Sequence, residues 1–270
     1  MKREMLTQRL ERILPTVEKP GRYVGGELNE IRKDWDSVRT HVALAFPDIY
    51  DIGVPNLGLT ILYHILNQRT DVLAERVYLP WIDMETAMRQ HGIPLYSLES
   101  KTPVRQFDIL GITLPYETLY TNVLNLLDLA GIPLHSSERT IQDPLVIAGG
   151  HAVFNPEPIA PFFDAFAIGE GEEIIHDIVN TYQEWKKHPT SRQSLLAELV
   201  KIEGVYVPSF YEPEYKEDGT IRALHRLHPD APSEIKKRLV AQLPKPPTRF
   251  IVPSVSVVHN RVSIEIMRGC

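Results

Sequence analysis

The sequence of residues 145–152 is LVIAGGHA, and that of residues 164–173 is DAFAIGEGEE. Each run contains four consecutive apolar residues that are followed directly by glycine. A short apolar run that stops at glycine is typical of a strand buried in a parallel sheet. In open α/β sheets, ligands bind at the carboxyl ends of the strands, so these glycines mark a candidate ligand site. The two runs therefore predict an α/β protein built on a parallel sheet.

The residues that follow these two strands allow two interpretations. Gly149 and Gly150 have no Cβ atoms, so nearby main-chain N–H groups can contact a flat or anionic ligand. Glu170 and Glu172 precede a helical pattern, where the positive end of a helix favours carboxylates. Alternatively, the diglycine is only a tight turn, and the two glutamates only cap the helix.

Apolar runs and helical patterns alternate along the chain as far as residue 201. This alternation predicts a doubly wound, Rossmann-like parallel sheet with helices on its faces. Strands are expected at residues 42–46, 76–80, 107–114, 145–149 and 164–168, with an edge strand at 94–98. Helices are expected at residues 1–14, 57–66, 83–90, 119–130, 174–185 and 194–201, with Asp83 as a cap and Gly131 as a stop.

The chain from about residue 204 to residue 247 is rich in proline and charge. We interpret it as a connector with a small β element, because Asp218-Gly219 between two short strands is typical of a hairpin. His225 and His228 have a spacing that can bind metal on a helix. They lie in a probable strand, however, so an exposed pair without metal is expected. Residues 236–238 are expected to be a solvated run of positive charge.

Composition sets limits on the class of protein. The chain has 270 residues, of which 43% are hydrophobic and 24% are charged, which is an ordinary globular balance. The net charge of −6 gives no basic field that would indicate a nucleic-acid surface. No apolar run has membrane-spanning length, and residues 1–5 do not begin a secretory signal. A single cysteine excludes an internal disulfide, so we expect a cytoplasmic location.

The order of these motifs resembles that of a known domain. Gly-Gly-His-Ala, then Asn-Pro-Glu-Pro at residues 155–158, then Gly-Glu-Gly-Glu is similar to the cobalamin-binding-like domain at the front of many radical S-adenosylmethionine (SAM) enzymes. Residues 21–27, GRYVGGE, match a segment of an uncharacterised radical SAM family with this domain. Gly25-Gly26 therefore has three interpretations: a flexible loop, a segment that lies over the ligand, or part of that family pattern.

The resemblance implies a cobalamin-like pocket at the carboxyl edge of the sheet. Its expected lining is Pro47, Tyr50, Leu57, Gly58, Thr113, Pro115, Gly149, Gly150, His151, Gly169, Glu170, Gly171 and Glu172. Tyr50, Tyr116 and Glu117 are either at this edge for a ligand or ordinary loop and helix-start residues. The base-off signature Asp-x-His-x-x-Gly is absent, because neither Asp48 nor Asp51 has a histidine two residues later. Cobalamin is therefore either bound without a protein ligand below the cobalt or lost.

Residues 255–258 and 262–267 are predicted to be two strands, and Arg268-Gly269-Cys270 follows them. In the resembling enzymes, the first barrel strand ends in Arg-Gly-Cys, and this cysteine opens a C-x-x-x-C-x-x-C motif. The resemblance implies that the three thiolates hold a 4Fe–4S cluster and that SAM chelates its fourth iron. Cys270 matches the first of these metal-binding cysteines, although Cys270 alone could be an inert thiol. One cysteine cannot hold the cluster, so we expect no radical chemistry unless this chain is a fragment.

These patterns divide the chain into four parts: an N-terminal helix and loop (1–36), a cobalamin-binding-like Rossmann domain (37–190), a connector (191–250) and the incomplete start of a radical SAM domain (251–270). The first hypothesis is the front part of a radical SAM enzyme that faces a C-terminal barrel. The second is a non-catalytic scaffold or substrate-docking domain that binds no cobalamin. A free-standing nucleotide-binding domain is disfavoured, because no G-x-G-x-x-G follows the first strand. The substrate is not encoded in these patterns.

Overall fold

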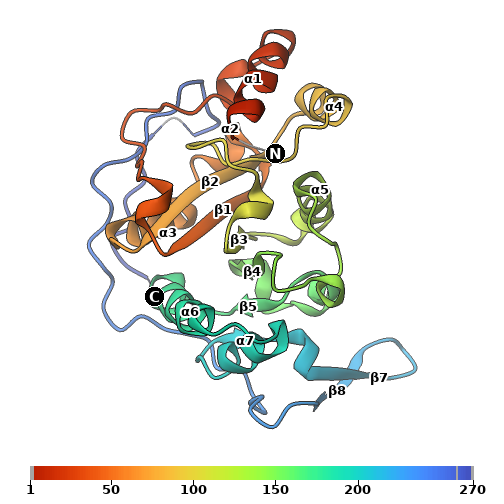
Figure 1. Cartoon of the computed structure of the whole chain (residues 1–270). Coiled ribbons are helices and arrows are strands. Elements are labelled where there is room, and N and C mark those ends of the chain that lie inside the picture. Colours follow the sequence, from red (N-terminus) through yellow and green to blue (C-terminus); the bar gives the residue numbers. More distant parts are fainter. Residues whose placement is uncertain (1–2, 260, 269–270) are drawn as a thin grey trace.

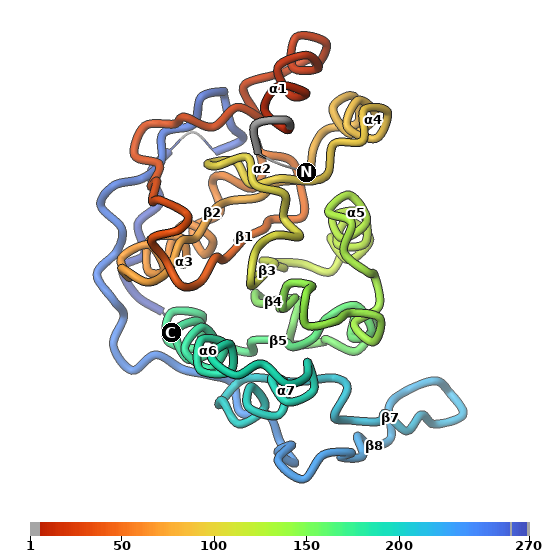
Figure 2. Tube along the Cα trace, in the orientation of Figure 1, coloured from red at the N-terminus to blue at the C-terminus, as the bar shows by residue number. Residues whose placement is uncertain are grey.

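The computed structural model describes residues 3–259 and 261–268 (Figures 1 and 2). A six-stranded sheet with the order β2-β1-β3-β4-β5-β6 forms its centre, and only β6 runs antiparallel to its neighbour. The strands are β1 (Thr40–Ile49), β2 (Val72–Leu79), β3 (Ile109–Thr113), β4 (Leu145–Gly149), β5 (Ala165–Ala167) and β6 (Val205–Tyr206). The order 2-1-3-4-5 is that of a common doubly wound fold, which confirms the predicted Rossmann-like α/β class.

Helices cover both faces of the sheet. They are α1 (Arg3–Ile13), α2 (Tyr50–Gly53), α3 (Leu57–Gln68), α4 (Ile82–Gln90), α5 (Tyr120–Ala130), α6 (Gly171–Lys187) and α7 (Arg192–Leu199). Figure 1 shows α3 and α6 on one side of the sheet and α4 and α5 on the other. The chain reverses its winding direction between β1 and β3, and ligands of such folds bind beside that point.

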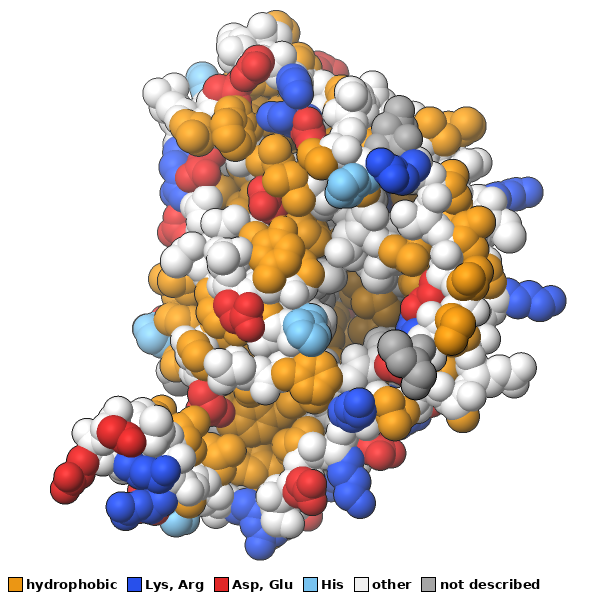
Figure 3. Space-filling model, turned by 180° about the vertical axis from the view of Figure 1, so that it is seen from behind, with side chains coloured by type: hydrophobic (Ala, Val, Ile, Leu, Met, Phe, Trp, Pro, Cys, Tyr) orange, Lys and Arg blue, Asp and Glu red, His pale blue; other side chains and the backbone are white. Residues whose placement is uncertain are grey.

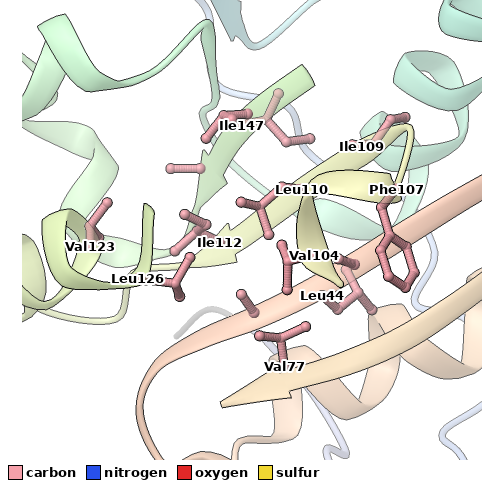
Figure 4. Packing of buried hydrophobic residues seen from close by; sticks show 14 of the residues in the cluster. Leu44, Val77, Val104, Phe107, Ile109, Leu110, Ile112, Val123, Leu126 and Ile147 are labelled. Carbon is pink, nitrogen blue, oxygen red and sulfur yellow. The ribbon is translucent and has the colours of Figure 1, made fainter. Parts of the chain in front are cut away.

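The core lies between the sheet and these helices. The strands β1 to β4 are almost wholly buried, as continuous apolar runs of parallel strands predict. Figure 4 shows Val123 and Leu126 of α5 beside Ile112 of β3. Alternate residues of β3 therefore face opposite helices: Ile112 points to α5, and the residues on either side of it point towards α6.

Local signals explain where several elements begin and end. Gly131 ends α5 in the left-handed conformation with φ of 67°, as predicted. The side chain of Asn56 caps α3, which was not predicted. The hairpin of β7 (Tyr211–Tyr215) and β8 (Ile221–Arg226) forms around Asp218-Gly219, as expected. Asp83 is not the cap of α4, because Trp81 occupies that position and Asp83 lies inside the helix. Strand β6 was not expected; it pairs with β5 and completes the sheet.

The edge strand predicted at residues 94–98 is wrong. This segment has only an isolated bridge between Tyr96 and Pro103. Its backbone groups have other partners, since Leu95 N–H donates to Leu129 O (2.8 Å) and Leu98 N–H donates to Arg76 O (2.8 Å). These single bonds join the segment to the end of α5 and to β2, so it forms no ladder and adds no strand to the sheet.

The two strands predicted near the C-terminus are also absent from the described part of residues 251–268. Val252 N–H donates to Leu28 O (3.0 Å), and Val258 N–H donates to Asp51 O (3.1 Å), so single bonds fix this segment to the domain. Val262, Ile264 and Ile266 leave more than half of their surface exposed. An alternating sequence forms a strand only beside a hydrogen-bonding neighbour, and no described segment provides one here.

Candidate functional site

A cavity of about 420 Å³ lies between the sheet and the helices α3 and α6, at the carboxyl ends of β3, β4 and β5. Its walls are largely apolar, with Ile61 and Leu62 from α3 and Ile174, Ile175 and Ile178 from α6. The face seen in Figure 3 is hollowed, with hydrophobic side chains inside the hollow and charged side chains at its border. The cavity occupies the edge of the sheet at which the sequence predicted a ligand site.

Two glycines create the floor of this cavity. In the sheet, Leu44, Gly111 and Ile147 are neighbours in one row, and Thr113, Gly149 and Ala167 are neighbours in the next. A Cβ added at Gly111 would meet its nearest atom at 3.5 Å, and one added at Gly149 would meet its nearest atom at 3.8 Å. Each glycine therefore leaves free space above the strand where its neighbours carry side chains.

Gly150 and Gly169 have a different role, because the protein's own backbone requires them. Gly150 has φ of 121° and Gly169 has φ of 112°, a region that residues with a Cβ rarely adopt. A Cβ on Gly150 would lie closer than 3.0 Å to Leu114 O, and one on Gly169 equally close to the backbone of Arg238. The tight-turn interpretation thus fits Gly150, whereas Gly149 opens the cavity.

The rim at the start of α6 carries a cluster of ionic contacts. Glu170 is the N-cap residue of α6, and Glu172 lies in its first turn with 7% of its surface exposed. Arg268 donates to both Glu172 oxygens, with Nη1 at 3.1 Å from Oε2, and its Nη1 lies 3.3 Å from Glu170 Oε1. Hydrogen bonds to Glu265 and to Glu172 raise the pKa of Arg268, so its charge is permanent.

The connector closes another side of the cavity. Arg238 N–H donates to Ile168 O (2.9 Å), and Glu170 N–H donates to Arg238 O (2.9 Å), so the connector extends the edge of the sheet. The Arg238 side chain pairs with Glu173 (3.0 Å) and Asp177 (3.3 Å) on α6. The prediction of a solvated charge run at residues 236–238 is therefore wrong for Arg238.

The structure brings most of the predicted pocket residues together. The cavity lining includes Gly58, Thr113, Gly149, Gly150, His151, Gly169, Glu170, Gly171 and Glu172. It does not include Pro47, Tyr50, Leu57 and Pro115. Pro47 O accepts from Asn122 Nδ2 (2.9 Å), and Leu57 borders two other cavities instead.

Tyr50 belongs to a buried ionic network beside β1 and β2, on the side of the sheet away from β5. Its hydroxyl donates to Glu27, and Glu27 pairs with Arg76, which also donates to Glu99 (2.6 Å). Burial, followed by the hydrogen bond to Glu27, raises the pKa of Tyr50. A Cβ on Gly25 would lie closer than 3.0 Å to Leu98 O, so Gly25 allows a close backbone contact beside this network and does not cover the cavity.

Many lining residues were not predicted as part of the pocket. Among them are Gly111, Phe154, Lys237, Leu239 and Arg268. A glycine inside an otherwise continuous strand indicates a close approach of other groups, so Gly111 carried a usable signal. Arg268 had none, because its partner Glu172 lies 96 residues earlier in the chain.

The other candidate metal ligands lie apart from the cavity. His225 Nε2 is 2.8 Å from Glu214 Oε2, and the ring of His228 stacks on Phe210 at 4.3 Å. Within residues 3–259 and 261–268, no three His, Cys, Asp or Glu side chains are grouped so that they could hold a metal ion. Cys270 lies outside the described residues. Among the described helices, none is both long and apolar enough to cross a membrane.

One family model matches more than half of the chain. The family model described as "Radical SAM proteins, N-terminal" matches residues 58–208. The uncharacterised protein MJ0966 of Methanocaldococcus jannaschii is 26% identical over 143 residues, which are 52% of this chain and 26% of that protein. The chain therefore spans about a quarter of the length of this curated relative.

Two solved structures of one enzyme were also found. The cobalamin-dependent SAM radical enzyme OxsB with aqua-cobalamin and SAM bound gives a TM-score of 0.39 at 15% identity, covering 68% of this chain and 22% of OxsB. The structure of OxsB with aqua-cobalamin alone gives 0.38 at 14% identity, covering 73% of this chain and 24% of OxsB.

Proposed function

The chain belongs to the family of N-terminal regions of radical SAM proteins, and from this membership we propose that it is the front part of a radical SAM enzyme. Its Rossmann-like domain binds cobalamin in the cavity above Gly111 and Gly149. A barrel that begins near residue 251 carries a 4Fe–4S cluster and SAM, with Cys270 as the first cluster ligand. The chain alone is inactive in this proposal, because its single cysteine cannot hold the cluster.

The shape of the cavity is the observation that supports cobalamin. The nucleotide tail of cobalamin ends in a flat, apolar benzimidazole ring, which needs a narrow apolar slot open at one end. The rows Leu44-Gly111-Ile147 and Thr113-Gly149-Ala167 give such a floor, and isoleucines of α6 give the opposite wall. When bound, cobalamin supplies a cobalt centre that can carry a methyl group or electrons.

The residues around the slot have distinct tasks in this proposal. The side chain of Thr113 and the imidazole of His151 place polar groups at the mouth, where the polar part of the ligand would lie. Leu239 and Phe154 line the cavity and are more than half exposed, so in this proposal a bound ligand would cover them. Tyr50 stands where the base-off signature Asp-x-His-x-x-Gly has its histidine, and it lies outside the cavity. In this proposal that position therefore supplies no ligand below the cobalt.

Cobalamin binding can be tested with two substitutions at one position. In Gly149→Ala the new methyl group meets its nearest atom at 3.8 Å, which is ordinary contact, so binding should persist. In Gly149→Phe the ring fills the slot, and we expect binding to weaken by at least about tenfold, since a buried ligand ring loses its contacts. Titration followed by the visible cobalamin spectrum measures both.

The same titration separates the proposal from its alternative. The connector residues Lys237 to Leu239 and Arg268 already cover part of the cavity, which favours a scaffold that binds no cofactor. An unaltered chain that neither changes the cobalamin spectrum nor retains cobalamin on gel filtration would support that scaffold. Equal binding by Gly149→Ala and Gly149→Phe would instead place any cobalamin outside the cavity.

A further inference from the structure

We infer that Arg268 and the two glutamates Glu170 and Glu172 form a clamp that holds the start of the barrel against the rim of the cavity. The inference rests on the proposed function, in which residue 251 onwards begins the barrel. It assigns a positioning task to the Gly-Glu-Gly-Glu loop, which the sequence analysis treated as a ligand contact or a helix cap. The partner of this loop is therefore the protein's own next domain.

The contacts of Arg268 are those of a formed clamp. Its Nε donates to Glu265 Oε1 (2.6 Å), and its Nη2 donates to Glu265 Oε2 (2.7 Å). Its Nη1 and Nη2 also donate to Glu172, and Nη1 lies beside Glu170 at the start of α6. Arginine binds carboxylates through two parallel N–H donors, which fixes orientation as well as distance. The guanidinium is thus held from the barrel side and from the domain side together.

The burial of Glu172 distinguishes this contact from an ordinary surface ion pair. The side chains of Lys201 and Glu198, a typical surface pair, are 48% and 55% exposed. The Glu172 side chain is only 7% exposed and that of Arg268 is 27% exposed. Because a buried carboxylate without a cation is strongly unfavourable, Glu172 needs a positive partner in a way that Glu198 does not.

The direction of α6 also requires carboxylates beside Arg268. Glu170 and Glu172 lie at the N-terminus of α6, where the helix dipole is positive and would repel an arginine. Only the two carboxylates make this position favourable for Arg268. A helix start selected for capping alone needs one acceptor, and Ser191 serves α7 in that way.

The clamp also fixes the terminal segment beside the cavity. Arg268 lines the cavity, so holding its guanidinium on α6 keeps this part of the segment at the cavity rim. The side chain of Arg238, which pairs with Glu173 on the same helix, fixes the connector nearby.

Distances between two spin labels test the clamp in the whole 270-residue chain without any cofactor. Cys270 is replaced by serine, and labels are attached through Met267→Cys and Lys187→Cys. Met267 is 67% exposed, and position 187 is the last residue of α6. The length of α6 predicts a single narrow distribution centred on the order of 25 Å.

Three variants carry the test in this labelled background. In Arg268→Ala we expect the distribution to become at least about twice as wide, because charge-assisted bidentate contacts no longer hold the segment. Glu172→Gln keeps the shape of the glutamate and should widen the distribution less. Arg249→Ala removes an exposed arginine from the same region, for which no described ion pair exists, and should leave the distribution unchanged.

The measured distance distributions test the clamp, and cobalamin titration tests the proposed function independently. Distributions for Arg268→Ala and Glu172→Gln that match the unaltered chain would overturn the clamp, even if the chain binds cobalamin. Widening in both variants, together with a chain that fails to bind cobalamin, would support the clamp and contradict only the proposed cofactor. Equal widening in Arg249→Ala would also overturn the clamp, because any lost arginine would then suffice.

Discussion

Two glycine–glutamate segments of this chain look alike in sequence and differ in the structure. In Gly25-Gly26-Glu27, the glutamate is buried and pairs with Arg76 beneath the N-terminal loop. In the segment from Gly169 to Glu172, the last glutamate pairs with Arg268 at the rim of an open cavity. In both segments a carboxylate holds an arginine from a distant part of the chain. The residues from Gly169 to Glu172 line the cavity above Gly111 and Gly149, whereas Gly25, Gly26 and Glu27 do not.

The difference lies in what the glycines contact. Gly25 and Gly169 both allow close contact with another stretch of backbone, whereas Gly149 and Gly111 leave space that no part of the protein fills. Glycine-rich sequence therefore has two distinct uses here. One stabilises the fold, and the other leaves room for a ligand.

The largest expected effect follows from comparing the two arginines. Arg76→Met leaves Glu27 and Glu99 buried without their cation, which should reduce the free energy of unfolding by about 3–5 kcal/mol. Arg268→Met leaves one buried carboxylate, Glu172, without its cation at a partly exposed rim, and should reduce it by less, about 1–2 kcal/mol. Urea denaturation near neutral pH measures both values. Equal losses would mean that the two segments have the same structural role.

Substitution of Gly25 and of Gly26 by alanine should reduce stability by different amounts. Gly25 and Gly26 both have positive φ, but only a Cβ on Gly25 would collide with Leu98 O. Gly26→Ala should cost about 1–2 kcal/mol of stability, the usual penalty for the left-handed conformation. Gly25→Ala should cost at least about 1 kcal/mol more, because the Leu98 loop must move. Similar thermal midpoints for the two variants would contradict this contact.

The smallest expected effect is a pH dependence beside the same network. Burial lowers the pKa of the Lys101 ammonium to about 8, while its Nζ donates to Val24 O (2.7 Å). Between this value and the unfolded pKa of 10.5, the unfolded chain binds more protons, so stability rises with pH. Compared with Lys101→Met, the unaltered chain should gain about 1 kcal/mol between about pH 8 and 9.5. A constant difference across this range would place Lys101 in water.

Local patterns were sufficient to predict the parallel strands β1 to β5 and the edge of the sheet at which the cavity lies, but not β6. The apolar runs at residues 42–46, 107–114 and 145–149 became β1, β3 and β4, because a strand buried on both faces needs continuous apolar sequence. The glycine-tipped strands β4 and β5 did place Gly149 and Gly169 at one edge, where they line a common cavity.

Contacts between distant segments could not be predicted in the same way. Arg76 and Glu27 or Arg268 and Glu172 are paired only because the fold brings them together, and no local spacing encodes such a pair. The prediction of strands at residues 255–258 and 262–267 was wrong for a related reason. A strand forms only where another segment provides hydrogen-bond partners. The role of each glycine likewise depended on backbone that lies nearby only in the folded protein.

The proposed function depends most on whether the space above Gly111 and Gly149 binds the cofactor. A crystal structure of the chain grown with cobalamin tests it directly. We expect electron density for the nucleotide tail between β3, β4 and α6, with the benzimidazole ring over Gly111 and Gly149. Cobalamin bound elsewhere, or crystals in which this space is filled by the protein's own side chains, would contradict it.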